Sequence, residues 1–378
     1  MQKKLKILQI NKLYYPVIGG VEKVVQQIAE GLKGTTDMKV LVCQPGGQSS
    51  LETIHGVEVH KAASLGSFFS MPVSLDFLRQ FKILSRDRDI LHLHLPFPLA
   101  DLAVFLFRPK CQIALWWHSD IVRQKKFLLF YKPLLHWLLR RADVIFVATQ
   151  GHIDGSNYLR AYRKKCRIVP FAVDDSILKK GQNYVKSRQK TGRTKRPVSI
   201  LSVGRLVYYK GYAVLLEAMA RVRGATLDIV GSGPLEKSLR AQARKLGIAQ
   251  NIRFSGSVGD TELSRAFARC DIFVLPSIAK TEAFGLVQIE AMAYGKPVIN
   301  TNLPGGVPYV SLHDKTGLTV PPKDIPAMAS AIQKLVDDEK LRLKFGKAAC
   351  KRVRECFTME QMLNGVMREY RKLANRRI

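Results

Sequence analysis

Short apolar runs alternate with longer segments of helical spacing along the whole chain. In the first half, runs of strand length lie at 6–10, 40–43, 57–60, 90–95, 113–117, 143–148 and 168–171. In the second half they lie at 200–203, 226–230, 252–256, 272–275 and 298–302. The segment 21–32, between the first two runs, carries its apolar residues at helical spacing. Strands that alternate with helices form parallel sheets covered by helices, so the pattern predicts an α/β protein.

The length of the chain predicts two domains, because 378 residues exceed the size at which a single hydrophobic core stops growing. Between the two alternating halves, the segment 176–196 holds eight Lys or Arg residues and no acidic residue. That composition is typical of a solvated linker. We therefore expect a first domain over 1–175, a basic linker over 176–197, a second domain over 198–357 and a final basic helix over 358–378.

A net charge of +31 narrows the range of partners. A surplus this large favours a polyanion, which can be a nucleic acid, an anionic membrane or a phosphorylated substrate. The six cysteines are scattered without CxxC or paired-histidine spacing, which indicates reduced thiols and no zinc site. The apolar part of MQKKLKILQI is too short for a signal peptide, and no uncharged apolar run is long enough to span a bilayer. We therefore expect a cytoplasmic protein.

The stretch TEAFGLVQIEAMA, residues 281–293, carries the clearest candidate chemistry. It follows a short buried strand, 272–275, and its spacing predicts a helix that begins near Phe284 or Gly285. Free N–H groups at such a helix end favour a phosphate, whereas Glu282 and Glu290 would repel it. A phosphate-binding helix end beside two carboxylates is explained when the phosphates carry a sugar on each side. Glu290 would then accept a hydrogen bond from a ribose hydroxyl, and Glu282 from a hexose hydroxyl. A bare pair of glutamates is more often two solvated residues on an ordinary helix.

The pair Glu282 and Glu290, with seven residues between them, resembles the paired-glutamate motif of the retaining family 4 glycosyltransferases. Two further motifs match this family in order, GGVE at 19–22 and GRLVYYKG at 204–211. The resemblance covers essentially the whole chain. It implies the GT-B fold, an α/β architecture of two doubly wound, Rossmann-like domains that face each other across a cleft. It also implies that the C-terminal helix returns to the first domain.

The resemblance assigns catalytic roles to four residues. Arg205 and Lys210 match the basic pair that stabilises the donor diphosphate as it leaves, which is work that a metal ion does elsewhere. Glu282 would bind the transferred hexose, and His118, at the end of the strand 113–117, matches the histidine that reaches this sugar. We therefore expect no metal and no other cofactor, with a nucleotide-sugar as the donor substrate.

The same resemblance predicts the residues that hold the donor. Two glycines of the first domain would lie under the diphosphate and sugar, Val258 would contact the nucleotide base, and Glu290 would bind the ribose. The full predicted set is Gly19, Gly20, Gly231, Val258, Ala283, Phe284, Gly285, Leu286 and Glu290. Gly231 belongs to a GSGP turn, which by itself is weak support for a nucleotide contact.

Two other features of the first domain need an interpretation. Asp87 and Asp89 imitate the DxD metal signature of other glycosyltransferases, but they lead into a buried strand without further oxygen ligands nearby, so we reject a metal site there. His92 and His94 point to the same face of the strand 90–95. We expect one or both to be core or cleft-edge histidines.

The segment RQKKFLLFYKPLLHWLLRR, residues 123–141, is apolar on all sides between Phe127 and Leu139. Cations flank it at both ends, a pattern typical of a helix at a membrane interface. The residues expected to contact the membrane are Phe127, Phe130, Tyr131, Trp137, Lys125, Lys126, Arg140 and Arg141. The alternative is an internal core helix.

We expect a glycosyltransferase on the inner face of the plasma membrane. The resemblance to O-antigen and capsule enzymes favours transfer of mannose from GDP-mannose to a lipid-diphosphate-linked saccharide. Rhamnosyl, glucosyl or N-acetylhexosaminyl transfer from dTDP-, GDP- or UDP-sugars is the alternative. Two other classes stay open, namely a non-catalytic GT-B scaffold and a basic nucleic-acid-binding protein. The chain lacks the aromatic and basic motif of RNA-binding modules, so nucleic acid is the weaker partner.

Overall fold

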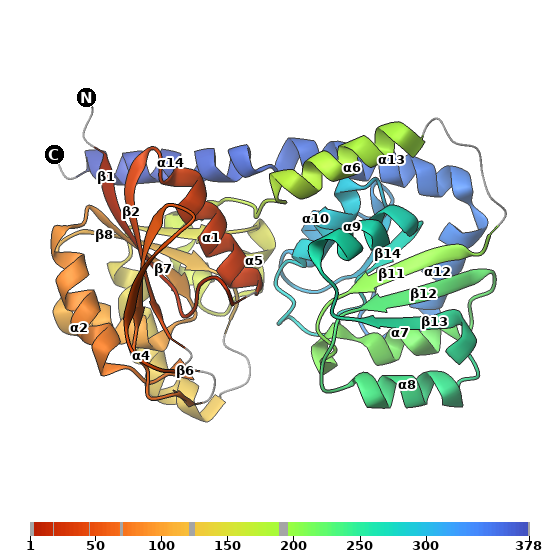
Figure 1. Cartoon of the computed structure of the whole chain (residues 1–378), viewed down its shortest axis with the longest axis horizontal. Helices are drawn as coiled ribbons and strands as arrows, with labels where there is room; N and C mark the ends of the chain where they lie inside the picture. The colour runs from red at the N-terminus through yellow and green to blue at the C-terminus, as the bar shows by residue number, and fades with distance from the viewer. Residues whose placement is uncertain are drawn as a thin grey trace. The chain divides into compact units, whose positions relative to one another are not determined.

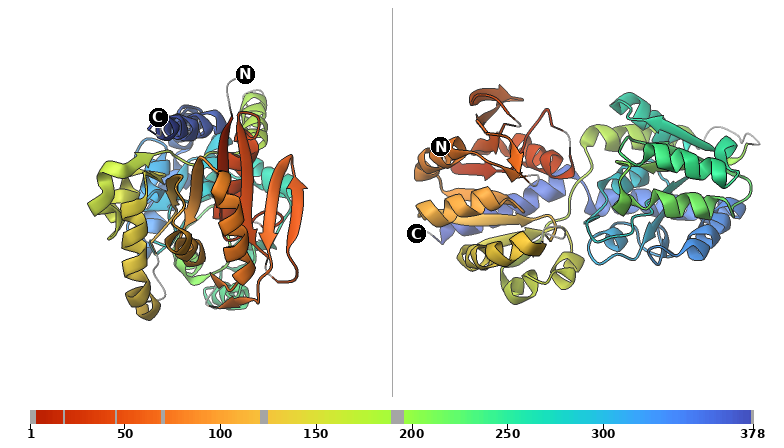
Figure 2. Two further views of the ribbon diagram at one scale, coloured as in Figure 1. Left: turned by 90° about the vertical axis from the view of Figure 1, so that its left-hand side faces the viewer. Right: turned by 90° about the horizontal axis from the view of Figure 1, so that it is seen from below.

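The computed structural model describes residues 4–17, 19–44, 46–68, 71–120, 125–188 and 196–376 (Figures 1 and 2). The chain forms two compact units. Unit 1 comprises Met1–Phe171 with Met359–Ile378, and unit 2 comprises Ala172–Thr358. Each unit is built on its own largely parallel sheet with helices on both faces. The two sheets agree with the α/β architecture that the alternating pattern predicts.

Unit 1 contains an eight-stranded sheet of order β10-β9-β8-β7-β1-β2-β4-β3, in which only the edge strand β3 is antiparallel. Its strands are β1 Leu5–Ile10, β2 Thr36–Cys43, β3 Ser50–Ile54, β4 Val57–Ala62, β7 Ile90–Leu95, β8 Gln112–Trp117, β9 Val144–Val147 and β10 Cys166–Ile168, beside a separate hairpin of β5 Ser67–Phe68 and β6 Met71–Pro72. Its helices are α1 Gly20–Leu32, α2 Leu75–Leu84, α3 Pro98–Phe107, α4 Lys125–Arg141, α5 Gln150–Gly155 and α14 Met359–Asn375.

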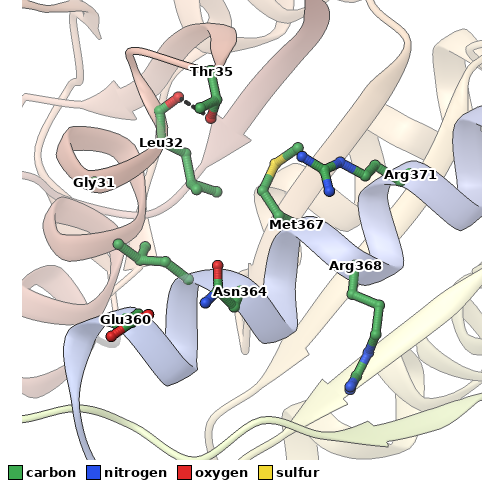
Figure 3. A pocket seen from close by; sticks show the side chains of 9 residues that line it. Gly31, Leu32, Thr35, Glu360, Asn364, Met367, Arg368 and Arg371 are labelled. Atoms are coloured by element: carbon green, nitrogen blue, oxygen red, sulfur yellow. Dashed lines mark hydrogen bonds between the residues drawn. The ribbon is translucent and has the colours of Figure 1, made fainter.

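The C-terminal helix α14 belongs to unit 1, as expected (Figure 1). A Cβ at Gly31 of α1 would lie 2.4 Å from Leu363 Cδ1 of α14, so the glycine allows the two helices to pack closely. Next to this contact, a pocket of about 580 Å³ opens between the two helices (Figure 3). None of the residues that line it belongs to the predicted donor or catalytic set.

Unit 2 contains a six-stranded parallel sheet of order β13-β12-β11-β14-β15-β16. Its strands are β11 Val198–Val203, β12 Ala225–Val230, β13 Ile252–Gly256, β14 Ile272–Val274, β15 Val298–Thr301 and β16 Gly317–Val320. Its helices are α6 Asp175–Arg188, α7 Tyr212–Met219, α8 Glu236–Lys245, α9 Asp260–Arg269, α10 Leu286–Ala293, α11 Val307–Val310, α12 Ile325–Asp337 and α13 Glu339–Cys356. The strand order reverses between β11 and β14, which places a topological switch point there.

The expectation of a solvated linker over 176–197 is wrong for residues 176–188. They lie in α6, which packs on α9 and α10 within unit 2. A Cβ at Gly181 would lie 2.4 Å from the Ala293 carbonyl oxygen, so this glycine allows α6 to approach the end of α10. The Lys296 ammonium, whose side chain is fully buried, donates to Ala268 O and Cys270 O and contacts the Tyr184 hydroxyl of α6 at 3.2 Å. Residues 189–195 lie outside the described residues.

Helix α4 is partly a core helix. Leu135, Leu138 and Leu139 are buried in the cluster that also takes up α2 and α3. Tyr131 is buried as well, and its hydroxyl donates to the fully buried Asp101 of α3. The membrane prediction is therefore wrong for Tyr131, because its polar atom is satisfied inside the protein.

Other residues of the predicted membrane face have different surroundings. Trp137 is half-buried with its ring edge-on to Phe105, at 5.0 Å between centroids. Arg141 pairs with Asp143 at 3.2 Å and donates to Cys111 O, whereas Arg140 is exposed. The side chains of Lys125, Lys126, Phe127 and Phe130 lie outside the described residues. Among the helices of the described ranges, none combines the length and the apolarity needed to cross a bilayer.

Candidate active site

The predicted catalytic residues of unit 2 lie at its topological switch point. Arg205 and Lys210 follow β11, and Glu282 follows β14, the neighbouring strand in the sheet. Parallel neighbours end at the same edge, so both loops emerge at the carboxyl end of the sheet, where open α/β sheets bind ligands. Residues 72 positions apart in sequence are thereby brought together.

Glycines hold the backbones of these loops in close contact. A Cβ at Gly211, whose φ is 72°, would lie 2.0 Å from Pro276 O. A Cβ at Gly231 would lie 2.2 Å from Gly204 O, in the loop after β11. The Ile278 amide also donates to Tyr209 O at 2.8 Å. The loops after β11, β12 and β14 therefore form one tightly packed platform.

Lys210 and Glu282 form a largely buried ion pair on this platform. Lys210 Nζ lies 2.6 Å from Glu282 Oε2, with side-chain exposures of 12% and 10%. The Ser277 hydroxyl donates to the same oxygen at 2.9 Å, and Thr301 Oγ1 donates to Ser277 O at 2.6 Å. Burial lowers the pKa of Lys210, but the Glu282 carboxylate outweighs this effect and the pKa lies above its ordinary value. Lys210 is therefore a fixed cation at neutral pH.

Ser277 and Thr301 were missed by the sequence reasoning. Ser277 lies in the loop between β14 and Glu282, so its position near a strand's carboxyl end was an available signal. No comparable signal marks Thr301, because its contact depends on β15 lying beside β14. Arg205, the other predicted cation, is exposed on the loop after β11.

Helix α10 begins at Leu286, close to the predicted start. Its N-cap is Gly285 in the left-handed region, with φ of 73°. A Cβ there would lie 2.6 Å from Leu275 Cδ2, so a larger residue would strain the turn 283–286. The Gly306 amide donates to Ala283 O at 2.7 Å and fixes the turn from the far side. Helix α10 therefore starts four residues after Glu282, in the loop that follows β14.

The remaining donor-binding candidates of unit 2 lie on both sides of the switch point. Glu290 is buried on α10, one turn beyond the N-terminal turn. Gly231 directly follows β12 and its amide donates to Gly256 O at 2.7 Å, and Val258 is half-buried after β13. The Ser232 and Ser257 hydroxyls, 2.8 Å apart, join these two loops.

In unit 1, the glycine loop lies at the junction of β1 and α1, as predicted. Gly19 is the extended N-cap of α1, and Gly20 is the first helical residue. A Cβ at Gly19 would lie 2.2 Å from Glu22 Oε2, so a larger residue there would require the Glu22 side chain to move. Burial raises the pKa of Glu22.

His118 follows β8 and is buried in a stack of rings. Its ring lies nearly parallel to that of Phe171, with 5.5 Å between centroids and 11° between planes. Its Nε2 lies 3.0 Å from His94 Nδ1. Burial lowers the pKa of His118 to about 3, so the ring is neutral at pH 7.

His92 and His94 lie on the same face of β7, as predicted, with ring centroids 4.6 Å apart. Both are fully buried core histidines. His92 Nδ1 lies 2.6 Å from the Tyr370 hydroxyl of α14, and His94 Nε2 lies 3.2 Å from Gln9 Oε1 of β1. Gln9 and Tyr370 were missed by the sequence reasoning.

Asp87 and Asp89 both bind Lys6, near the start of β1. Asp87 pairs with Lys6 Nζ at 2.6 Å, and Asp89 accepts from the Lys6 amide at 2.9 Å. Across the described ranges, no three His, Cys, Asp or Glu side chains come together in a way that could hold a metal ion.

Comparisons with known proteins cover both units. The profile described as Glycosyltransferase Family 4 matches residues 18–177, and the one described as Glycosyl transferases group 1 matches residues 184–352. The D-rhamnosyltransferase WbpZ of Pseudomonas aeruginosa is 33% identical over 359 residues, 94% of this chain and 92% of that protein. The O-antigen chain mannosyltransferase C of Escherichia coli is 29% identical over 372 residues, 98% of this chain and 99% of that protein.

Solved structures share the fold at lower identity. Sucrose-phosphate synthase from Thermosynechococcus elongatus superposes with a TM-score of 0.78 at 21% identity, covering 98% of this chain and 99% of that one. The Anabaena protein Alr3699/HepE in complex with UDP gives a TM-score of 0.77 at 19% identity, covering 97% of this chain and 100% of that one.

Proposed function

This chain belongs to the family 4 glycosyltransferases, and from that premise we propose that it transfers mannose from GDP-mannose to a lipid-diphosphate-linked saccharide during surface polysaccharide synthesis. The observation that carries the proposal is the buried Lys210–Glu282 pair, with Glu282 four residues before the start of α10. It joins a fixed cation, suited to a diphosphate, to a carboxylate, suited to a sugar hydroxyl. The O-antigen mannosyltransferase relative supports the choice of sugar and acceptor.

Lys210 and Arg205 would stabilise the leaving nucleoside diphosphate. As the bond between the sugar's anomeric carbon and the phosphate oxygen breaks, negative charge accumulates on the diphosphate. A preorganised cation and helix N–H groups favour that charge without reorganising in the transition state. Since Glu282 keeps Lys210 charged and in place, the site is prepared before the donor binds. These groups supply the electrostatic work without a metal ion.

Glu282 would bind the hexose. Its contacts to Lys210 and Ser277 both use Oε2, and Oε1 is the oxygen proposed to accept from a sugar hydroxyl. The carboxylate would thereby align the sugar with the diphosphate that Lys210 holds. Alignment of this kind lowers the activation free energy by several kcal/mol when it places the reacting atoms in a near-attack geometry.

The proposed reaction retains the anomeric configuration by a front-face route. The anomeric carbon develops oxocarbenium character as the diphosphate departs, and the acceptor hydroxyl attacks from the same side. Its oxygen forms the new glycosidic bond, and its proton passes to the departing phosphate oxygen. The products are the extended saccharide and the nucleoside diphosphate, so atoms and charge balance.

D-rhamnose is the second candidate sugar, favoured by the 33% identity to WbpZ. D-rhamnose is mannose that lacks one hydroxyl, so the two donors differ at a single group.

Val258 and Gly231 are the residues proposed to lie near the nucleotide base, and Glu290 is proposed to bind the ribose of the nucleotide.

We also propose that the protein works on the inner face of the plasma membrane. Helix α3, beside α4, exposes Leu102, Phe105 and Leu106 to 37%, 37% and 53%. Exposed cations lie at the ends of the two helices, Arg108 directly after α3 and Arg140 in the last turn of α4. Apolar side chains rimmed by cations suit an anionic bilayer, and such a surface would bring the enzyme to a lipid-linked acceptor.

A donor panel tests the proposed function. GDP-, UDP- and dTDP-sugars are screened first by thermal shift and then by turnover with polyprenyl-diphosphate saccharides. GDP-mannose should give the largest shift and support transfer. Turnover with GDP-D-rhamnose alone would establish the second candidate. Stabilisation by donors without transfer to any acceptor would contradict the enzymatic proposal and favour a binding scaffold.

A further inference from the structure

His94 has a hydrogen-bond partner on each ring nitrogen. Its Nε2 lies 3.2 Å from Gln9 Oε1, and its Nδ1 lies 3.0 Å from His118 Nε2. All three side chains are buried, with exposures of 0%, 1% and 6% along the series Gln9, His94, His118. The series runs across neighbouring strands β1, β7 and β8 to the carboxyl end of the sheet.

With the Gln9 amide turned so that Oε1 faces His94 and its Nε2 is buried without a partner in the described part of the chain, the series assigns each proton. An amide oxygen only accepts, so His94 Nε2 carries a proton and donates it to Gln9. A neutral imidazole has one N–H, which leaves His94 Nδ1 as an acceptor. The proton between the two rings therefore belongs to His118 Nε2. His118 Nδ1, for which the described residues provide no hydrogen-bond partner, is left with a lone pair.

Both rings are neutral in this arrangement. Burial lowers the pKa of His94 well below its ordinary value, with His92 and His118 adding to the effect. The rings are also fixed in orientation, because His118 stacks on His94 at 5.3 Å and on Trp116 at 6.1 Å between centroids. Rotation of the His118 ring to exchange its two nitrogens would disrupt these contacts.

We propose that His94, held by Gln9, is a positioning residue that keeps His118 in the Nε2–H tautomer, so that His118 Nδ1 accepts a hydrogen bond from a hydroxyl of the transferred hexose. This inference rests on the proposed glycosyl transfer and on the sugar-binding role that the family resemblance predicts for His118. The hydrogen bond at one imidazole nitrogen decides which nitrogen is available at the other, so a buried partner sets what the ring can recognise.

The tautomer of His118 would affect which sugar the site prefers. An acceptor nitrogen favours a hexose with a hydroxyl at that position and disfavours a deoxy sugar, because the lone pair would then stay unpaired in a buried site. The opposite tautomer would present an N–H and could bind an ether or ring oxygen equally well.

Nitrogen-15 NMR of the full chain labelled in histidine tests the tautomer without requiring activity. The chemical shifts of His118 should show a protonated Nε2 and an unprotonated Nδ1. His94→Asn places an amide oxygen near the former Nδ1, so it should preserve this tautomer. His94→Leu removes the acceptor, so it should give a mixture of tautomers and lower kcat by about 10-fold or more, the scale of losing a supporting hydrogen bond.

His92→Phe is the matched control, because His92 lies in the same stack but bonds to Tyr370. It should leave the tautomer of His118 unchanged. A protonated His118 Nδ1 in the wild type overturns the inference. A Gln9 amide turned the other way would produce that result. So does an unchanged tautomer in His94→Leu. If His118→Ala keeps full turnover, the proposed role of His118 itself fails, and that outcome is separate from the result for His94.

Discussion

Lys210 and Glu282 act as a unit, since they form an ion pair in a site that is about nine-tenths buried. We expect Lys210→Ala to lower kcat by about 100-fold or more, the scale of losing one preorganised electrostatic group. Steady-state kinetics with the preferred donor measures the effect. Lys237→Ala, which removes an exposed cation of α8, is the matched control and should keep wild-type turnover. Wild-type turnover in Lys210→Ala would refute the assignment of this residue.

Asp101 gives the protein a pH-dependent stability. Burial raises its pKa from 3.8 to about 7, although the hydrogen bond from Tyr131 opposes the shift. Between these two values the folded state keeps a proton that the unfolded state has lost, so the free energy of unfolding should fall as pH rises from about 4 to 7. Above pH 7 the contribution of Asp101 to the free energy of unfolding should no longer change with pH.

Asp101→Asn removes the titrating group and should flatten that part of the profile. Urea titrations between pH 4 and 8 measure the slope for both proteins. Asp314→Asn, at an exposed acid, is the control and should keep the wild-type slope. An identical slope in Asp101→Asn would mean that other groups account for the pH dependence.

At the scale of elements, α6 depends on one glycine. Gly181→Ala should reduce the free energy of unfolding by about 1–3 kcal/mol, because the new Cβ would lie 2.4 Å from Ala293 O and must push α6 off α10. Chemical denaturation measures the loss. Lys180→Ala, at the exposed neighbouring position, should change stability little. Equal stability of the two variants would contradict the close packing.

Helix α6 also shows why part of the fold could not be predicted. Its inward positions Ile177, Leu178, Gly181, Tyr184 and Val185 have helical spacing, but the cations between them dominate the composition and suggested a linker. Helix α4 posed the opposite problem, because an apolar segment with cationic ends is common to core and interfacial helices. Only the packing of Tyr131 and its neighbours distinguishes the two.

The elements around the site were more predictable. The strand predicted at 272–275 is observed as Ile272–Val274, and the helix predicted near Phe284 or Gly285 begins at Leu286. Periodicity could not predict the Lys210–Glu282 contact, because it depends on β14 lying beside β11 while β12 and β13 lie on the other side. The family resemblance assigned both residues to the donor site, Lys210 to the diphosphate and Glu282 to the hexose, but did not predict their contact. The tautomer of His118 depends on three strands at once and left no signal in the sequence.

The exposed face of α3 should contribute to membrane binding. Replacing Phe105 and Leu106 with Ser should weaken binding to phosphatidylglycerol liposomes, because apolar burial is lost. The thermal shift by the donor should stay unchanged, because neither residue belongs to the predicted donor-binding set. Cosedimentation measures the binding. Leu343→Ser, at an exposed leucine of α13, is the control and should bind as the wild type does. Wild-type binding in the α3 variant would exclude this face.

At the scale of the whole molecule, the charge of +31 should make membrane binding sensitive to salt. Electrostatic attraction is screened over about 10 Å at 0.1 M salt, whereas apolar burial is not. High salt should therefore release the protein from anionic liposomes only in part, and neutral liposomes should bind it weakly. A salt-sensitive shift on DNA, without any response to nucleotide-sugars, would favour the nucleic-acid-binding class instead.

The most direct test of the central claim is the rate of sugar transfer in excess EDTA. Arg205 and Lys210 are proposed to supply the positive charge that a metal ion supplies in other glycosyltransferases. Transfer from GDP-mannose to a polyprenyl-diphosphate saccharide should then continue at an unchanged rate, with a product that retains the anomeric configuration. Complete loss of transfer in EDTA, restored by manganese or magnesium, would contradict the account.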